Sequence, residues 1–152
     1  MRFLGLLVLL FIGRSATWTS GRLPLENVSK GSFKRNKHKF RLTGLVQIHH
    51  IIPREFASHP LIVAQHYPME RGANLMFMPT IEGTRTLNTV RPCHEGGHLA
   101  YNEYVGASLS RIATSPYSKT QRGEALRRLV RYLRLALCTQ EAHPPWRDGR
   151  HT

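Results

Sequence analysis

The stretch Leu45–Pro53, LVQIHHIIP, places two adjacent histidines at the end of an apolar run rich in β-branched residues. Valine and isoleucine favour strands, and the closing proline cannot extend a ladder of backbone hydrogen bonds. A second short apolar run, Asn74–Met78, opens with an asparagine and is also followed by a proline. We therefore expect two short strands that form a hairpin, with His49 and His50 at the end of the first.

A second pair of histidines, His94 and His98, follows in the segment 91–102, RPCHEGGHLAYN. Their spacing of i, i+4 puts both imidazoles on one side of a helical turn, where they can hold one metal ion. Two ligands are too few for tight binding, and the earlier pair offers a third. The remaining histidine of that pair can then act as general base on an attacking water. The four histidines together predict a hydrolytic metal centre.

Two helices are expected in the C-terminal half of the chain. The first begins near residue 94 or 98, continues to Ile112 and ends at the Ser115-Pro116 dipeptide. The second covers about Thr120–Leu137, and its apolar residues fall at helical spacing: Leu126, Leu129, Val130, Leu133 and Leu137. This stripe predicts a face that packs on the core. The other face carries Arg127, Arg128, Arg131 and Arg134, as either a phosphate-facing or a simply solvated surface.

The charge of the chain indicates a polyanionic partner. Its 152 residues, of which 41% are hydrophobic, are enough for one domain with a modest core, and they carry 22 basic against 9 acidic residues, a net charge of +13. A cation excess of this size favours nucleic acid, because each neutralised phosphate releases condensed counterions. We expect DNA rather than RNA as the partner, and the sequence leaves the choice between the two open. The alternatives are a cationic membrane-active protein and a soluble basic protein. The arginines expected to contact nucleic acid are Arg54, Arg85, Arg91, Arg127 and Arg131.

The chain divides into four segments. Residues 1–20 are typical of a signal peptide, with a basic start, the apolar run Phe3–Ile12 and a small-residue cleavage site, and they predict secretion. The alternative is an N-terminal helix or a start codon placed too early, and then a cytoplasmic protein. Residues 21–41 are interpreted as a basic flexible arm, 42–138 as the folded domain and 139–152 as a disordered tail. Within the domain, residues 83–92 are expected to form a polar loop.

Two cysteines, Cys93 and Cys138, do not decide the compartment. They can form a disulfide in an oxidising environment and remain ordinary thiols in a reducing one. After the N-terminal run no segment is long and apolar enough for stable insertion into a membrane. No inhibitor or protein partner can be recognised from the sequence.

The order and spacing of these residues resemble the HNH/endonuclease VII superfamily of nucleases, in particular its AHH group. The resemblance covers about residues 45–112. It is carried by His49–Pro53, His59-Pro60, Asn74-Leu75, Pro79-Thr80 and the His94–Asn102 segment. Ile48 stands where an alanine usually precedes the histidine pair.

This resemblance implies an α+β fold with a small ββα-metal (His-Me finger) core, to which the C-terminal amphipathic helix is added. It implies a metal-dependent endonuclease that hydrolyses phosphodiester bonds, with His50 as general base and Asn74 as the structural asparagine. His49, His94 and His98 would bind one divalent ion, which the sequence leaves open as Mg²⁺, Mn²⁺, Zn²⁺ or Ni²⁺. An exchange of roles between His49 and His50 also remains open.

Two other functions compete with this interpretation. The segment His94–His98 is literally H-E-x-x-H, the helix motif of zinc peptidases, in which Glu95 would be the general base and Glu103 or Glu124 a third ligand. Its two adjacent glycines cost about 1 kcal/mol each inside a helix, and the earlier histidine pair would have no role. The third possibility is a non-enzymatic secreted cationic protein that binds nucleic acid or membranes.

Overall fold

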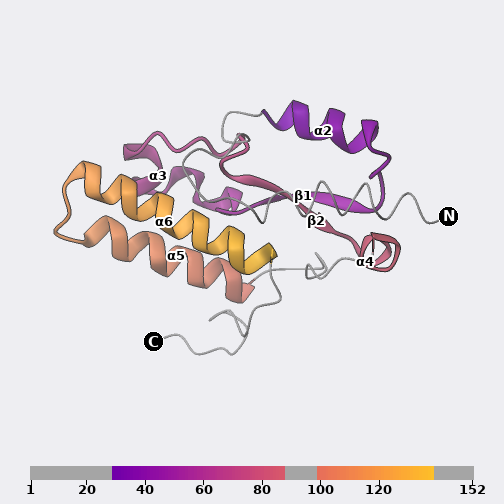
Figure 1. The fold of residues 1–152 in the computed structure, drawn as a ribbon. Coiled ribbons are helices and arrows are strands. Elements are labelled where there is room, and N and C mark those ends of the chain that lie inside the picture. The colour runs from indigo at the N-terminus through magenta and orange to yellow at the C-terminus, as the bar shows by residue number, and fades with distance from the viewer. Residues whose placement is uncertain (1–28, 88–98, 139–152) are drawn as a thin grey trace.

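A two-stranded antiparallel sheet lies at the middle of the protein, between one helix on one side and two long helices on the other (Figure 1). The structure is a computed structural model that describes residues 29–87 and 99–138. Its elements are α2 (Lys30–Lys39), β1 (Val46–His50), the 3-10 helix η1 (Arg54–Ser58), α3 (Pro60–Ala64), β2 (Leu75–Pro79), α4 (Ile81–Leu87), α5 (Leu99–Thr114) and α6 (Lys119–Cys138). The expected α+β class with a ββα-type core is confirmed.

The register of the hairpin decides which side chains share a face. Ile48 pairs with Phe77 and His49 with Met76, so these two pairs lie on opposite faces of the sheet. The Phe77 face is directed toward α2, because the Phe33 ring of that helix packs edge-on against Phe77 with the centroids 5.1 Å apart. The Met76 face is directed toward α5 and α6, which belong to the same buried cluster as Met76.

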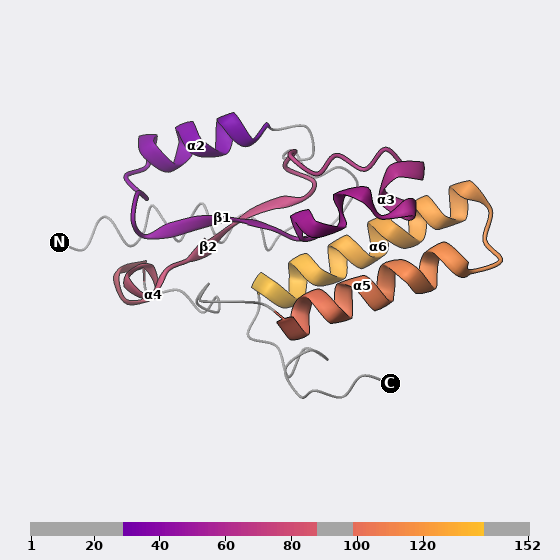
Figure 2. The same cartoon turned by 180° about the vertical axis from the view of Figure 1, so that it is seen from behind.

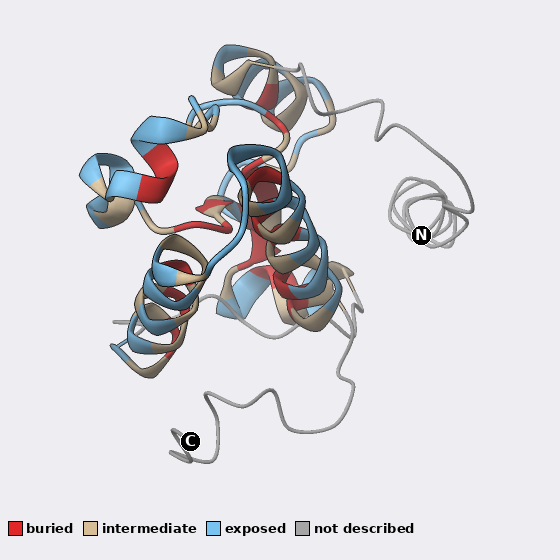
Figure 3. Cartoon of the chain, turned by 90° about the vertical axis from the view of Figure 1, so that its left-hand side faces the viewer, coloured by how far each residue is buried: buried red, intermediate tan, exposed pale blue. Residues whose placement is uncertain are grey.

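The hydrophobic core lies where the sheet, the segment after β1, α3 and the two C-terminal helices meet. Figure 2 shows α3, α5 and α6 side by side, and Figure 3 shows buried residues on the inner sides of the helices. Both expected helices are found, α5 ending just before Ser115-Pro116 and α6 covering the predicted Thr120–Leu137. The apolar stripe of α6 faces the core, with Leu129 half-buried and the other four residues buried. The buried large apolar side chains of these helices are Tyr101, Val105, Leu109, Leu126, Val130, Leu133 and Leu137. No helix within the described residues is both long and apolar enough to span a membrane.

Residues 30–39 form a helix, so the prediction of a flexible arm over 21–41 is wrong for this part of the chain. The Ser29 hydroxyl caps α2 by accepting a hydrogen bond from the Ser32 backbone N–H. Phe33, which is 5% exposed, attaches the helix to the sheet. A single apolar residue in a basic segment produces no periodic pattern, and short helices depend on tertiary packing for their stability. The described structure therefore begins at residue 29, before the predicted start of the folded domain at residue 42.

Two further short helices, α3 and α4, flank the strands. Residues 83–87 of the predicted polar loop belong to α4, where the Thr80 hydroxyl accepts a hydrogen bond from the Gly83 N–H. A Cβ atom on Gly83 would lie 1.7 Å from the Leu45 carbonyl oxygen, so only glycine allows α4 to approach the start of β1. Helix α3 begins with a proline and is capped by the imidazole of His59. The predicted signal peptide, the predicted tail and Cys93 lie outside the described residues.

Replacing Phe33 with alanine is expected to lower the free energy of unfolding by about 3 kcal/mol, because the ring is nearly fully buried against Phe77. Urea denaturation measures the loss, and amide hydrogen exchange of residues 30–39 shows whether α2 detaches. The same change at half-buried Phe40 is the control and should cost less. Unchanged protection of α2 in the Phe33 variant would contradict the role assigned to this contact.

Candidate active site

The two adjacent histidines of β1 lie on opposite faces of the hairpin. His49 is 6% exposed and is directed toward α5, where its ring centroid is 5.8 Å from that of Tyr101. The Tyr101 hydroxyl donates a hydrogen bond to the Ile51 carbonyl, and burial raises the pKa of this phenol, so it remains a donor. Tyr101 thus connects the first turn of α5 to the chain directly after the histidines.

His50 is on the face that α2 covers, and its side chain is 12% exposed. Its Nε2 atom is 3.1 Å from Oε1 of Glu70, in the loop that precedes β2. Burial lowers the pKa of His50 below its ordinary value, although the hydrogen bond and the charge of Glu70 oppose this change. The imidazole is therefore predominantly neutral at pH 7, as a proton acceptor must be.

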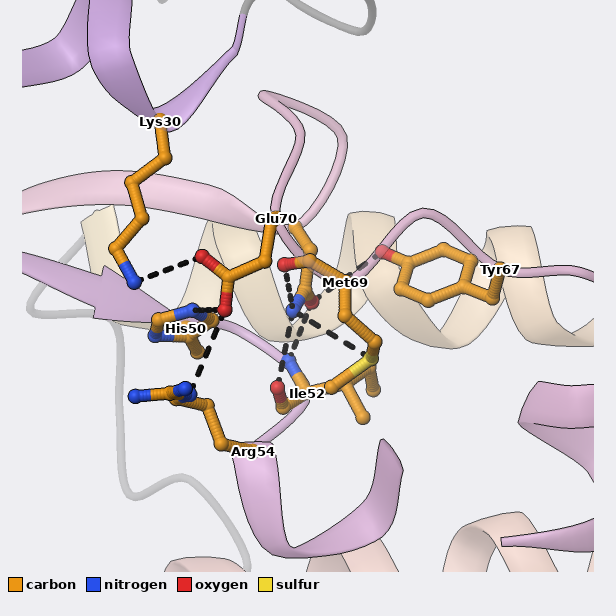
Figure 4. Close-up of polar contacts among 8 residues, drawn as sticks. Lys30, His50, Ile52, Arg54, Tyr67, Met69 and Glu70 are labelled. Carbon is orange, nitrogen blue, oxygen red and sulfur yellow. Dashed lines mark hydrogen bonds and ion pairs between the residues drawn. The ribbon is translucent and has the colours of Figure 1, made fainter. Parts of the chain in front are cut away.

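Glu70 is the common partner of three donors from three other elements (Figure 4). Nζ of Lys30, at the start of α2, is 2.7 Å from its carboxylate, and Nε of Arg54, in η1, is 3.4 Å away. The hydrogen bond from Lys30 is the main cause that lowers the pKa of Glu70, with His50 adding to it. We call Lys30, His50, Arg54 and Glu70 the Glu70 cluster. It joins α2, β1, η1 and the loop before β2 at one point.

Asn74 is fully buried and connects the segments at the ends of the two strands through its side-chain amide. Its Oδ1 atom accepts a hydrogen bond from the Ile52 N–H at 2.7 Å, and its Nδ2 donates to the Ile52 carbonyl at 3.0 Å. The same Nδ2 donates to the Met69 carbonyl at 3.1 Å, and the Tyr67 hydroxyl lies 3.3 Å from Oδ1. Asn74 therefore holds the segment after β1 against the segment that carries Glu70.

The other predicted site residues are distributed more widely. His94, His98 and Arg91 lie outside the described residues. Within the described ranges, 29–87 and 99–138, no group of three histidines, cysteines, aspartates or glutamates could hold a metal ion. Arg54 is 71% exposed beside His50, and Arg85 is exposed on α4. Arg127 and Arg131 are exposed on α6, which covers the His49 side of the sheet rather than the His50 side.

Sequence reasoning did not find Glu70 or Lys30 as site residues. Both come from segments without periodicity, one in the predicted flexible arm and one in a connection between strands. The one feature of the sequence that could have pointed to Glu70 is the scarcity of acidic residues. With 22 basic residues in the chain, each carboxylate is expected to have several cationic neighbours. Which cations these are depends on the tertiary fold.

A family model of nucleases in the HNH/ENDO VII superfamily, defined by a conserved AHH, matches residues 31–136. The chain belongs to this AHH nuclease family. Nucleases of the superfamily generally use a divalent metal ion. The match includes α2, which lies outside the resemblance stated from the sequence, and it includes the H-E-x-x-H segment that suggested a peptidase. Neither the curated proteins nor the solved structures that were compared contain a match to the chain.

One position of this AHH-family chain departs from the family pattern. Ile48 precedes the two histidines in place of alanine. Its side chain is on the Phe77 face of the sheet, away from His49, so the larger residue is directed to the side that α2 covers. The departure therefore leaves the His49 side unaltered.

A further correction concerns Arg134, which was expected on the outer face of α6. Its guanidinium is half-buried and donates hydrogen bonds to the carbonyls of Gly72 at 2.7 Å, Ala73 at 2.9 Å and Leu75 at 3.3 Å. Carbonyl groups of a buried loop need donors, and the long side chain reaches them from the helix. Arg134 thus supports the loop that carries Asn74.

In this AHH-family protein, Asn74→Ala is expected to lower the free energy of unfolding by about 3 kcal/mol, because buried backbone groups of Ile52 and Met69 lose their partner. Urea denaturation measures the change. Asn74→Asp keeps the shape but removes the donor, and it should be at least as destabilising. Asn36→Ala, on α2, is the control and should be close to neutral. An Asn74→Ala variant as stable as this control would contradict the structural role.

Proposed function

We propose that the protein is a metal-dependent endonuclease that hydrolyses phosphodiester bonds of DNA, with His50 as the general base. The observation that carries this proposal is the split of the histidine pair between two faces of the hairpin. One imidazole is directed to the helix that follows His98 in the chain, and the other is held neutral and partly exposed beside cationic side chains. His49, on one side of the strand, can thus bind a metal ion, and His50, on the other side, can accept a proton from the attacking water.

The hydrogen bond to Glu70 assigns the two nitrogens of the His50 ring different tasks. A carboxylate only accepts, so Nε2 carries the proton and donates it to Oε1 of Glu70. Nδ1 is then the unprotonated nitrogen that can take a proton from water. Transfer to Nδ1 leaves an imidazolium whose charge the neighbouring carboxylate stabilises. His50 is therefore the base, and Glu70 orients it.

His49 is proposed as a ligand of the divalent ion, together with His94 and His98. The fit rests on His49 being directed toward the first turn of α5 and on an imidazole donor set that suits a borderline divalent ion. Helix α5 begins at Leu99, the residue bonded to His98. The ion would supply Lewis-acid stabilisation of the charge on the scissile phosphate and on the leaving oxygen.

Asn74 and Arg54 support the reaction without accepting the proton. Asn74 fixes the position of Ile52, two residues after the base, and of Met69, the residue before Glu70. Asn74 therefore keeps His50 and the carboxylate of Glu70 in a fixed relative position. Arg54 extends a mostly exposed guanidinium beside Glu70, where it can contact a phosphate oxygen.

His50→Ala should reduce nicking of supercoiled plasmid by roughly 10²–10⁴-fold while the protein stays folded and still takes up metal. His49→Ala is the matched variant, because the same atoms are removed one residue away on the opposite face. It should abolish the rise in melting temperature that a divalent ion causes by binding the folded state. Chelator should stop nicking by the unaltered protein.

The two readouts separate the roles of the histidines. Plasmid nicking by His50→Ala at the rate of the unaltered protein would refute the assignment of the base. Loss of the metal-dependent stabilisation in His50→Ala, with its retention in His49→Ala, would show that the two roles are exchanged.

Glu70→Gln should lower kcat about tenfold without raising KM. The amide retains the shape but loses the charge that stabilises the imidazolium, and Lys30 and Arg54 lose an anionic neighbour, so their attraction for phosphate does not fall. Glu55→Gln, an exposed residue of η1, is the matched control for the change of charge. Steady-state nicking rates and the melting temperature are measured for both variants. Equal kinetics of the two would remove Glu70 from the mechanism.

A further inference from the structure

We infer that the outward face of α2 is the surface that binds the phosphate backbone of duplex DNA. This inference rests on the proposed function and names where its substrate lies. The face consists of Lys34, Arg35, His38 and Lys39, which are all exposed. None of the arginines that the sequence predicted to contact nucleic acid belongs to α2; those are Arg54, Arg85, Arg91, Arg127 and Arg131.

The helix separates its residues sharply between two sides. Phe33, Asn36, Lys37 and Phe40 are buried or half-buried and are spaced at i, i+3, i+4 and i+7 on the side of the sheet. The exposed basic residues fall on the opposite side of the same ten-residue helix. The docking of a single phenylalanine on Phe77 therefore orients the whole basic face away from the sheet.

The charge of α2 is not balanced within the helix. Residues 30–39 contain five lysines and arginines and no acid, with like charges at i, i+4 between Lys30 and Lys34 and between Arg35 and Lys39. Pairs of this kind destabilise a helix. Among residues 29–87 and 99–138, Lys30 is the only cation of α2 that forms an ion pair. A polyanion bound to the exposed face would neutralise the repulsion that the isolated protein retains.

The position of α2 connects this face to the candidate base. The backbone N–H of Lys30 donates to the Glu70 carbonyl, and its ammonium contacts the Glu70 carboxylate that also binds His50. The first residue of the helix is thus part of the Glu70 cluster. Helix α6 instead packs on the Met76 face of the sheet (Figure 1). The N-terminal end of α2 is therefore the part of the helix that lies next to His50, whereas α6 lies on the opposite side of the sheet.

The dimensions of the face suit a nucleic acid backbone. From Lys34 to Lys39 the helix rises about 7.5 Å at 1.5 Å per residue. Each strand of duplex DNA presents one phosphate charge per roughly 3.4 Å of the axis, so about two phosphates of one strand lie within that length. The exposed cations can therefore contact phosphates without reading bases, which predicts binding of low sequence specificity.

The test compares two triple variants of the full chain that lose the same charge. Lys34→Gln/Arg35→Gln/Lys39→Gln alters α2, and Arg127→Gln/Arg128→Gln/Arg131→Gln alters exposed positions of α6. Glutamine is chosen because its helix propensity is close to that of lysine and arginine, and circular dichroism verifies the fold. Fluorescence anisotropy with a labelled DNA duplex of about 20 base pairs, two helical turns, is measured in chelator, so that hydrolysis does not interfere. Titrations at several salt concentrations give the slope of log K against log[salt].

The α2 triple variant should bind at least about tenfold more weakly at 0.1 M salt, with a slope smaller by about 2.7, since each lost phosphate contact contributes about 0.9. The α6 triple variant should keep the affinity of the unaltered protein within about twofold. Equal losses in both variants, or a larger loss in the α6 variant, would overturn the assignment to α2 while leaving the nuclease proposal intact. Stronger binding of an RNA duplex of the same length would overturn the assignment of the ligand to DNA.

Failure of the unaltered protein to bind the duplex even at low salt would overturn both this inference and the proposed function. If the α2 variant binds DNA more weakly but is stabilised by the metal ion as much as the unaltered protein, the variant has lost contacts to DNA and not the metal site. The metal measurement is needed because it reports on His49 and not on α2. The two proposals are thereby tested separately.

Discussion

The side chain of Asn74 is the interaction on which the arrangement of the candidate site depends. It is fully buried and satisfies both backbone groups of Ile52 and the carbonyl of Met69. These groups lie in two segments that are separated in the sequence and have no regular ladder to pair them. Buried backbone groups without partners are costly, so the amide stabilises one particular approach of the two segments. That approach brings Glu70 to His50.

The geometry of a β-strand explains how two neighbouring histidines can have different environments. Successive side chains point to opposite faces, so His49 meets the helical core and His50 meets the Glu70 cluster. Each environment follows from what covers its face. Helices α5 and α6 supply an apolar surface with Tyr101 above one histidine, and α2 supplies a basic helix beside the other.

The Glu70 cluster shows how one acid can organise a strongly basic protein. Lys30, His50 and Arg54 come from three elements, and the carboxylate between them offsets the repulsion between the charges of Lys30 and Arg54 while it accepts a hydrogen bond from His50. Glu70 is 46% exposed, so solvent screens these pairs and their contribution to global stability is small. The main effect of these pairs is to hold α2 and η1 in place beside the imidazole of His50.

The sequence by itself determined the elements that have a repeating pattern or a closing proline. The two strands, helix α5 and the apolar stripe of α6 could all be predicted, because periodicity and turn residues are local properties. The histidine pair also indicated a nuclease from the sequence alone, and the family match supports that activity. The division of labour between His49 and His50 was proposed from the resemblance, and neither the structure nor the family match tests it.

Only the tertiary structure decided what the aperiodic segments do. Helix α2 depends on one phenylalanine that meets a partner on β2, and no pattern within residues 30–39 encodes that contact. Arg134 turns inward because unpaired carbonyls of a distant loop lie within its reach. Glu70 reaches His50 because Asn74 holds their segments together. In each case the deciding partner is remote in the chain, and a local pattern carries no information about which remote groups will meet.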